Sequence, residues 1–264
     1  MLMEKSLIII KPDLEKNLAG KEKLINLISD SGLTVYDTSQ IIFNNWMIES
    51  MWPQFQSDVI SMRILSNYLD KKKLEILYLE GENALENTLK IKKKIRHEFS
   101  QSPFQSCLHT PANLNEYQHN IDIINGIESN RYYPSKVPPQ FIPLEDLGYS
   151  VELLISTADL LWNILNKDRE SLFKVHESLI SKKVFSLILT NCNHPHYNIS
   201  IEYVVASILL VNPSLELSTV YISTMVAIMR GEAVLFTSDD LAYLEDTCSK
   251  LLSKLIVCKV VESE

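Results

Sequence analysis

The chain has 264 residues, of which 46% are hydrophobic, and a formal net charge of −8. This length predicts two domains of ordinary size, and the longest apolar runs, such as "VVASILLV", are too short to cross a bilayer. The charge is uneven, because residues 1–140 hold 16 Lys and Arg against 17 Asp and Glu, whereas residues 141–264 hold 9 against 16. An acidic surface repels phosphate backbones, so we expect neither a nucleic acid nor a membrane as a partner.

The first residues and the cysteines indicate a compartment. The start "MLMEKSLIIIKPD" has few apolar residues before Lys11-Pro12 and no small-residue cleavage site, which argues against a secretory signal. The four cysteines are scattered and form no C-x-x-C pair, which is typical of a reducing environment. We therefore expect a cytoplasmic protein, and we interpret Cys107 as a buried small residue rather than a nucleophile.

The first half of the chain alternates between strand-like and helix-like patterns. Short runs rich in β-branched and aromatic residues predict four strands, in "SLIIIK", "LTVYDTSQIIF", "LEILYLEG" and residues 104–109. Helical spacing predicts one helix over residues 17–31, two short helices over 44–70 that break near Pro53, and one further helix after the last strand. This order of elements predicts a ferredoxin-like α+β domain over residues 1–130.

The second half of the chain has a different character. Residues 131–148 contain four prolines and no apolar period, which predicts an extended linker. Residues 149–264 carry most of the negative charge, and their apolar spacing predicts an acidic all-α helical bundle domain with a core or a surface for a protein partner. Its expected helices cover residues 150–166, 169–190, 199–212, 214–231 and 238–258.

Three side chains of the first half point to phosphate chemistry. Lys11 ends the first predicted strand, Arg96 ends the basic run "KIKKKIR", and His109 lies 13 residues later at a strand-to-helix junction. Thr110 and Pro111 are typical of a helix start, where free amide groups and the helix dipole stabilise an anion. If the three side chains converge, they form a site for a phosphoryl group.

Four segments resemble nucleoside diphosphate kinases and follow that family's order. "SLIIIKPDLEKNLAGKEKLINLISDSG" is similar to the family's first strand, Lys-Pro-Asp turn and first helix, and "LEILYLEGENAL" to its strand and Glu-Gly-x-Asn turn. "IRHEF" resembles the family's Ile-Arg-Gly-Asp-Phe, at the same distance from the histidine, and "NEYQHNI" resembles the helix behind it. The resemblance covers about residues 4–125 and implies the family's fold for this domain.

The resemblance also implies an activity. A phosphotransferase of this kind moves the terminal phosphate of ATP, or of another nucleoside triphosphate, to a diphosphate through phosphohistidine, here at His109. Lys11 and Arg96 would hold the phosphates, and Mg²⁺ would bridge nucleotide oxygens. Because family members commonly assemble, we expect a homo-oligomer.

Several positions depart from the family's pattern. Ser106 stands where the family has an Asn that contacts the sugar, Thr110 replaces the Gly after the histidine, and Asn120 replaces the Glu that orients the imidazole. A segment that carries other phosphate ligands is shorter here, so Lys94 and its neighbouring lysines are the candidates to replace them. Trp52, Phe55 and Tyr68 are candidates for stacking on the base, and each also fits a place in the core. The alternative function is therefore a catalytically weak or inactive nucleotide-binding or scaffold protein, whose helical domain binds a partner.

One further pattern resembles a metal site. The sequence "NCNHPHYN" places Cys192, His194 and His196 within five residues. A structural zinc site needs four ligands, and no second cluster of ligands is near in the sequence, so a polar interhelical loop is favoured. We predict no metal site.

Overall fold

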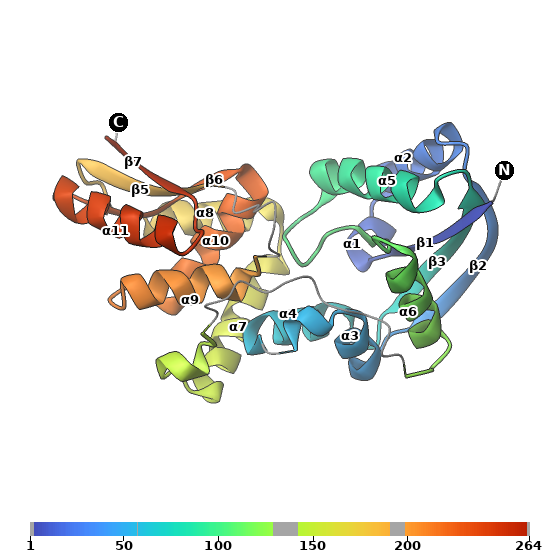
Figure 1. Cartoon of the computed structure of the whole chain (residues 1–264), viewed down its shortest axis with the longest axis horizontal. Coiled ribbons are helices and arrows are strands. Elements are labelled where there is room, and N and C mark those ends of the chain that lie inside the picture. The colour runs from blue at the N-terminus through green and yellow to red at the C-terminus, as the bar shows by residue number, and fades with distance from the viewer. Residues whose placement is uncertain (1–2, 57, 129–141, 191–198, 263–264) are drawn as a thin grey trace. The chain divides into compact units, whose positions relative to one another are not determined.

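The computed structural model describes residues 3–56, 58–128, 142–190 and 199–262. Their contacts divide the chain into two compact units, here called unit 1 and unit 2. Unit 1 comprises Met1–Gln56 and Leu65–Tyr133, and unit 2 comprises Ser57–Ile64 and Pro134–Glu264. Figure 1 shows the elements of both units, coloured along the chain. The piece Ser57–Ile64, which lies inside the predicted first domain, therefore groups with the second half of the chain.

Unit 1 is built on a four-stranded sheet in which every neighbouring pair is antiparallel. The strands lie in the order β2-β3-β1-β4, and β1 is buried from Ser6 onward because its apolar residues are covered on both faces. The register pairs Ile9 with His109, so the end of β1 lies beside the histidine. The four strands are β1 (Glu4–Ile10), β2 (Thr34–Ile42), β3 (Lys73–Gly81) and β4 (Leu108–His109).

Three helices of unit 1 begin at asparagine caps. The side chains of Asn17, Asn44 and Asn113 each accept a hydrogen bond of 2.9 Å from a backbone N–H three residues later, which satisfies one of the free donors of a helix start. Apolar side chains of two long helices, α2 and α5, pack with β1 and β3 into one core. The helices are α1 (Pro12–Glu15), α2 (Leu18–Asp30), α3 (Asn45–Met51), the 3-10 helix η1 (Pro53–Phe55), α5 (Ala84–Phe99) and α6 (Leu114–Ile124). One further helix, α4 (Val59–Leu69), begins in unit 2 residues and ends in unit 1 residues.

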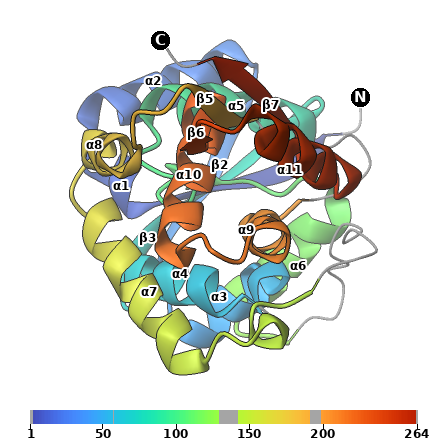
Figure 2. The ribbon, with the colours of Figure 1, turned by 90° about the vertical axis from the view of Figure 1, so that its left-hand side faces the viewer.

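Unit 2 contains a three-stranded antiparallel sheet as well as helices. The strands lie in the order β6-β5-β7, and α10 and α11 pack against them (Figure 2). The strands are β5 (Phe185–Thr190), β6 (Glu232–Ser238) and β7 (Cys258–Glu262). The helices are η2 (Glu145–Leu147), α7 (Val151–Leu165), α8 (Arg169–Leu179), α9 (Ile201–Val211), α10 (Leu217–Arg230) and α11 (Leu241–Ser253).

The predicted all-α bundle is therefore wrong for this half of the chain. The expected helix 169–190 ends at Leu179, and its second part, "FSLILT", forms β5. The expected helix 238–258 ends at Ser253, and Cys258 begins β7. Short apolar runs of four to eight residues fit a buried strand and a buried helix equally well, and each of these runs continues the apolar spacing of the helix before it.

Two other predictions concern residues that are only partly described. Residues 131–141 of the predicted linker lie outside the described residues, and residues 142–148 contain the short helix η2. In the described parts of the chain, no helix is long and apolar enough to span a membrane.

Candidate functional site

Lys11 is held at the end of β1, where the chain turns into α1. Its backbone N–H donates to the carbonyl of Cys107 at 2.8 Å. Its ammonium nitrogen Nζ donates to Ser106 Oγ at 3.0 Å and to the carbonyl of Phe104 at 3.3 Å. The residue is only 4% exposed, so Lys11 presents a nearly dehydrated positive charge to the segment that precedes His109.

His109 lies beside Lys11, at the end of β4. Its side chain is buried, at 6% exposure, and its Nε2 is 2.8 Å from Nδ2 of Asn120 on α6. The carboxylate of Glu116 on the same helix is 3.8 Å from Nε2. The ring of Trp52 meets the imidazole edge-on at 5.4 Å and also lies 5.3 Å from Lys11 Nζ, which places the ammonium and the imidazole around one indole.

Two further cations reach the same segment from α5. Arg96 donates from Nη2 and Nε to the carbonyl of Leu108, at 2.9 and 3.3 Å. Lys92, one helical turn earlier, donates to the carbonyl of Thr110 at 3.1 Å. Lys94 is exposed on α5, and the structure records no contact between it and this segment. Lys92 is thus the lysine of the basic run that reaches the site, and helical spacing from Arg96 would have identified it.

The positive charges of this cluster repel one another, and burial adds to the cost of protonation. Burial, followed by the positive charge of Arg96, lowers the pKa of Lys11 to about 7, and the carboxylate of Asp13 acts against this shift. Burial and Arg96 likewise lower the pKa of Lys92 to about 8. Burial and the charges of Lys92, Lys11 and Arg96 hold the pKa of His109 well below its usual value. A bound anion would relieve this repulsion, because an opposite charge favours the protonated lysines.

Asp13 organises the back of the cluster and was not singled out from the sequence. Its Oδ2 accepts the backbone N–H of Cys107 at 2.7 Å, and its Oδ1 accepts the hydroxyl of Tyr68. Cys107 adopts a positive φ of 64°, a strained conformation for a residue with a Cβ, which the bond from Asp13 supports. Burial and the Asp13 charge raise the pKa of the Cys107 thiol to about 12, which opposes formation of a thiolate nucleophile.

The helix after His109 begins later than predicted. Asn113 is its N-cap and accepts the N–H of Glu116, and Glu116 Oε2 in turn accepts the N–H of Ala112 at 2.7 Å. The expected cap at Thr110 is wrong, since α6 starts at Leu114. Asn113 and Glu116, three residues apart, have the spacing of a capping box, although the Glu116 carboxylate bonds to the residue before the cap, and this signal prevails over Thr110-Pro111. Thr110 Oγ1 is instead buried, with no hydrogen-bond partner among the described residues.

The structure thus brings most of the predicted site residues together. Ser106 contacts Lys11, Trp52 lies against both Lys11 and His109, and Asn120 contacts His109. Lys94 lies apart from them, and Lys92, one of the neighbouring lysines named as candidates, reaches the site instead. The residues that sequence reasoning missed are Asp13 and Glu116.

Comparisons with known proteins place the likeness in one half of the chain. No protein-family model matches the sequence, and no curated protein matches it. Among solved structures, the nucleoside diphosphate kinase of Aquifex aeolicus is 19% identical, covers 47% of this chain and 95% of its own, and has a TM-score of 0.39. That of Encephalitozoon cuniculi is 15% identical, covers 46% and 87%, and has a TM-score of 0.40. That of Borrelia burgdorferi, with bound vanadate and ADP, is 16% identical, covers 52% and 94%, and has a TM-score of 0.36.

About half of the chain is similar to these structures. TM-scores this low do not by themselves establish a common fold. The properties of the site therefore depend on its own contacts, charges and burial.

Unit 2 contains a second buried group of ionisable side chains, of opposite sign. Asp58 and Glu202 are each 2% exposed, and Asp58 Oδ1 accepts the N–H of Ser61 at 2.8 Å and the hydroxyl of Tyr221 at 3.4 Å. Asp58 Oδ2 and Glu145 Oε2 are buried without a hydrogen-bond partner in the described part of the chain. In the same part, no group of three or more His, Cys, Asp or Glu could hold a metal ion. The "NCNHPHYN" segment lies outside the described residues.

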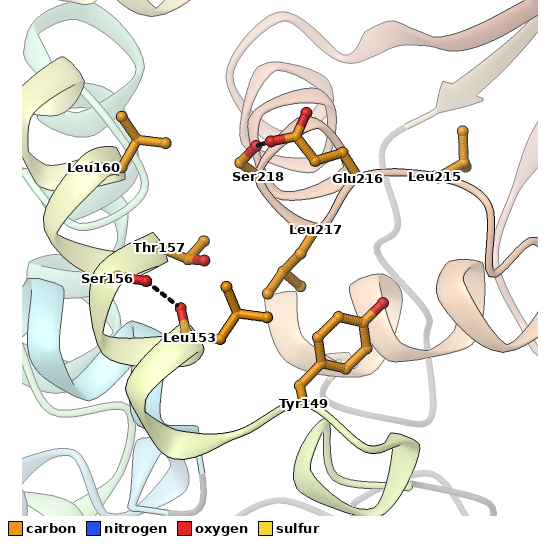
Figure 3. A pocket seen from close by; sticks show the side chains of 9 residues that line it. All are labelled: Tyr149, Leu153, Ser156, Thr157, Leu160, Leu215, Glu216, Leu217 and Ser218. Carbon is orange, nitrogen blue, oxygen red and sulfur yellow. Dashed lines mark hydrogen bonds between the residues drawn. The ribbon is translucent and has the colours of Figure 1, made fainter.

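Unit 2 also has an open hollow of about 400 Å³ between the starts of α7 and α10 (Figure 3). Two of its hydroxyl groups bond locally, because Ser218 Oγ donates to Glu216 at 2.6 Å and Ser156 Oγ donates to the carbonyl of Leu153 at 2.9 Å. Leucine side chains supply much of the wall, and the ionisable side chains of the hollow are Glu216 and Tyr149. Its lining residues are Tyr149, Leu153, Ser156, Thr157, Leu160, Leu215, Glu216, Leu217 and Ser218.

Proposed function

We propose that unit 1 binds the phosphates of a nucleotide and that His109 accepts the terminal phosphoryl group. The observation that carries this proposal is the convergence of an ammonium, a guanidinium and an imidazole on the segment 104–109. Lys11 contacts Ser106, Arg96 contacts Leu108, and His109 ends the segment. The antiparallel order β2-β3-β1-β4 supports the ferredoxin-like plan that the resemblance to nucleoside diphosphate kinases implies.

The contact with Asn120 selects the ring nitrogen that reacts. Nε2 faces the Asn120 amide at 2.8 Å, so the phosphoryl group would be taken at Nδ1. That nitrogen needs its lone pair, which requires the proton to be on Nε2. A half-turn of the Asn120 amide presents Oδ1 to an Nε2–H, and Oδ1 has no other partner among the described residues. Nδ1 would then attack the γ-phosphorus. The bond between that phosphorus and the oxygen that bridges to the β-phosphate breaks, and the nucleoside diphosphate leaves.

The charge of the site suits both partners of this step. The low pKa of His109 keeps the imidazole neutral near pH 7, which is the form that attacks. Lys11, Lys92 and Arg96 would neutralise the phosphates in a water-poor setting, where such contacts are strong. Mg²⁺ would enter with the nucleotide and supply further positive charge to its phosphates.

A second candidate function is nucleotide binding without transfer, in a protein whose unit 2 binds a partner. Two observations favour it. His109 is only 5% exposed, and Asn120, a neutral amide, offers less stabilisation than a carboxylate to the positive charge that grows on the imidazole as it attacks. Binding of phosphate requires only the cations and is compatible with both features.

Labelling with γ-³²P-ATP and Mg²⁺ tests the proposal. The wild-type protein should acquire an acid-labile, alkali-stable label, His109→Ala should acquire none, and His97→Ala, which changes an exposed histidine of α5, should be labelled like the wild type. Labelling of His109→Ala would contradict the proposal. Binding of ATP by a wild-type protein that takes up no label would instead establish the second candidate.

A further inference from the structure

Two cysteines of unit 2 lie side by side at the return from α11 to β7. Cys248 is in the second half of α11 and Cys258 is the first residue of β7. Their sulfur atoms are 3.1 Å apart, and both residues are buried, at 8% and 7% exposure. The Sγ of Cys258 also lies 3.6 Å from the carbonyl of Cys248.

The turn between them fixes this proximity. Leu255 has a positive φ of 66°, and the N–H of Ile256 donates to the carbonyl of Leu251 at 3.1 Å, which is the closure of a left-handed helix end. The chain therefore reverses direction directly after α11, and β7 packs against this helix. Because both cysteines belong to this one hairpin-like unit, their separation depends on local geometry alone.

We propose that Cys248 and Cys258 form a redox-responsive dithiol that closes to a disulfide and fastens β7 to α11. A disulfide has an S–S distance of about 2.03–2.05 Å, so the two sulfur atoms need to approach by about 1 Å. Small rotations of the two side chains provide a movement of this size without a change in the backbone conformation of the turn.

Because β7 lies at the edge of its sheet, the disulfide would affect how easily this strand opens. Among the described residues, β7 is an edge strand, and it pairs with β5 from Leu189–Cys258 to Phe185–Glu262. In the dithiol form the ladder to β5 and packing against α11 hold the strand. In the disulfide form its first residue is also covalently joined to the helix, so opening of β7 from the sheet becomes less favourable.

The oxidant that the reaction needs is a small-molecule disulfide, such as oxidised glutathione. The thiolate of one cysteine attacks a sulfur of that disulfide, which forms a mixed disulfide and releases one small thiol. The thiolate of the other cysteine then attacks the protein sulfur of the mixed disulfide and releases the second small thiol. The protein has lost two protons and two electrons, and the small disulfide has been reduced to two thiols.

Cys107 of unit 1 provides an internal control. It is buried, and its recorded side-chain neighbour is the hydroxyl of Ser100 at 3.9 Å. Its thiol has a pKa raised to about 12 by burial and by the charge of Asp13. It should therefore stay reduced under conditions that close the pair in unit 2.

The experiment uses the full chain, equilibrated with mixtures of oxidised and reduced glutathione, quenched with acid and alkylated under denaturing conditions. Mass spectrometry of peptides should show a Cys248–Cys258 cross-link that lacks two hydrogen atoms, alkylated Cys107, and complete reversal by dithiothreitol. Alkylation of both Cys248 and Cys258 at the most oxidising ratio, or a stable glutathione adduct on either without closure, would overturn the proposal.

A second measurement follows the opening of β7. Hydrogen exchange of the β7 amides should slow by about tenfold or more on oxidation, while exchange in β1 of unit 1 stays unchanged. Cys248→Ala and Cys258→Ala should each remove this response. A slowing that persists in either variant, or its absence in the cross-linked wild type, would show that the bond does not fasten the strand.

Discussion

Unit 1 and unit 2 both bury ionisable side chains, and they do so with opposite signs. In unit 1, Lys11, Lys92 and Arg96 surround His109, and burial lowers the pKa of each lysine. In unit 2, burial raises the pKa of Asp58 and of Glu202. The charge of Glu145 raises both pKa values further, and the charge of Asp58 adds to the rise for Glu202. The same cause, the loss of hydration, thus works against protonated lysines in one unit and against ionised carboxylates in the other.

The two clusters differ in how the unfavourable charge is relieved. The carboxyl groups of unit 2 need only a proton, and neutral groups such as Tyr221 and the Ser61 amide already bond to Asp58. The cations of unit 1 already donate to carbonyls, and an anion is what would compensate their charge. The cluster of unit 2 therefore bears on stability, whereas the charges of unit 1 support the role in anion binding that we propose.

The largest predicted effect is on the rate of phosphohistidine formation, when the charge of Lys11 is removed. Lys11→Met keeps an apolar stem between Trp52 and Tyr68 but removes the ammonium group from the site. We expect the rate of phosphohistidine formation to fall by about a hundred- to a thousandfold, as when one preorganised donor is lost at a reacting centre. Single-turnover labelling measures this rate. Lys16→Met, at an exposed position, is the control, and an equal loss in both variants would contradict a specific role for Lys11.

The next largest effect concerns the acid cluster of unit 2. Burial raises the pKa of Asp58 to about 6 and that of Glu202 to about 8, above their ordinary values near 4. The folded state therefore holds protons that the unfolded state releases, so the free energy of unfolding is highest below about pH 4 and falls as pH rises through 6 and 8. A loss of a few kcal/mol across this window is the expected size.

Glu202→Gln tests this pH dependence. The amide keeps the shape of the side chain but needs no proton, so the fall in stability between pH 6 and pH 9 should become much shallower. Hydrogen exchange of the α9 amides follows the stability of the helix that carries Glu202. Glu245→Gln, at an exposed position of α11, should leave the pH profile unchanged. A wild-type profile that is flat between pH 6 and pH 9 would contradict the account of this cluster.

A smaller effect distinguishes two lysines of one helix. Lys92 donates to the carbonyl of Thr110 beside His109, whereas Lys94 is exposed. Lys92→Ala should weaken ADP binding by about tenfold through loss of one charge-assisted contact. Lys94→Ala should change it by less than about twofold, because exposed charges contribute little. Isothermal titration measures both, and equal effects would show that the general charge of α5, not the site, attracts the nucleotide.

The smallest predicted change is a gain. Asn120→Asp places a carboxylate near Nε2 of His109, and a carboxylate only accepts hydrogen bonds, so the proton is fixed on Nε2 and Nδ1 is free to attack. We expect labelling to become faster by about tenfold. A ¹⁵N spectrum of the imidazole reports the tautomer. A folded Asn120→Asp protein with the Nε2–H tautomer and no gain in rate would show that orientation of the imidazole does not limit transfer.

Unit 1 was more predictable from the sequence than unit 2. The strands of unit 1 are bounded by strong signals, such as Pro12 after β1 and Gly81 at the end of β3, and the first three predicted strands are present. Of the fourth, predicted over residues 104–109, the structure keeps only Leu108–His109. In unit 2 the run "FSLILT" follows α8 without a proline or glycine between them, and its pairing with β6 and β7 depends on residues up to 77 positions away, at Glu262. Local periodicity contains no information on such pairing.

The sequence predicts those site residues whose position in the chain marks the end of a strand, a helix or a charged run. Lys11, Arg96 and His109 were identified, because each ends or follows a predicted element. Asp13 was missed because its function is to hold the backbone of Cys107, 94 positions later. The cap at Thr110 was wrong because Asn113 and Glu116 compete for the same helix start, and single-residue preferences do not decide between two overlapping signals.

Proton uptake on nucleotide binding tests the central claim most directly. At pH 8, Lys11 and Lys92 are partly deprotonated, and a phosphate beside them raises both pKa values. Titration of Mg²⁺-ADP into the wild-type protein, in buffers that differ in ionisation enthalpy, should therefore reveal a net uptake of protons, and Lys11→Met should show a smaller uptake. Binding of the nucleotide with no uptake, or with the same uptake in Lys11→Met, would contradict the claim that these cations form the anion site.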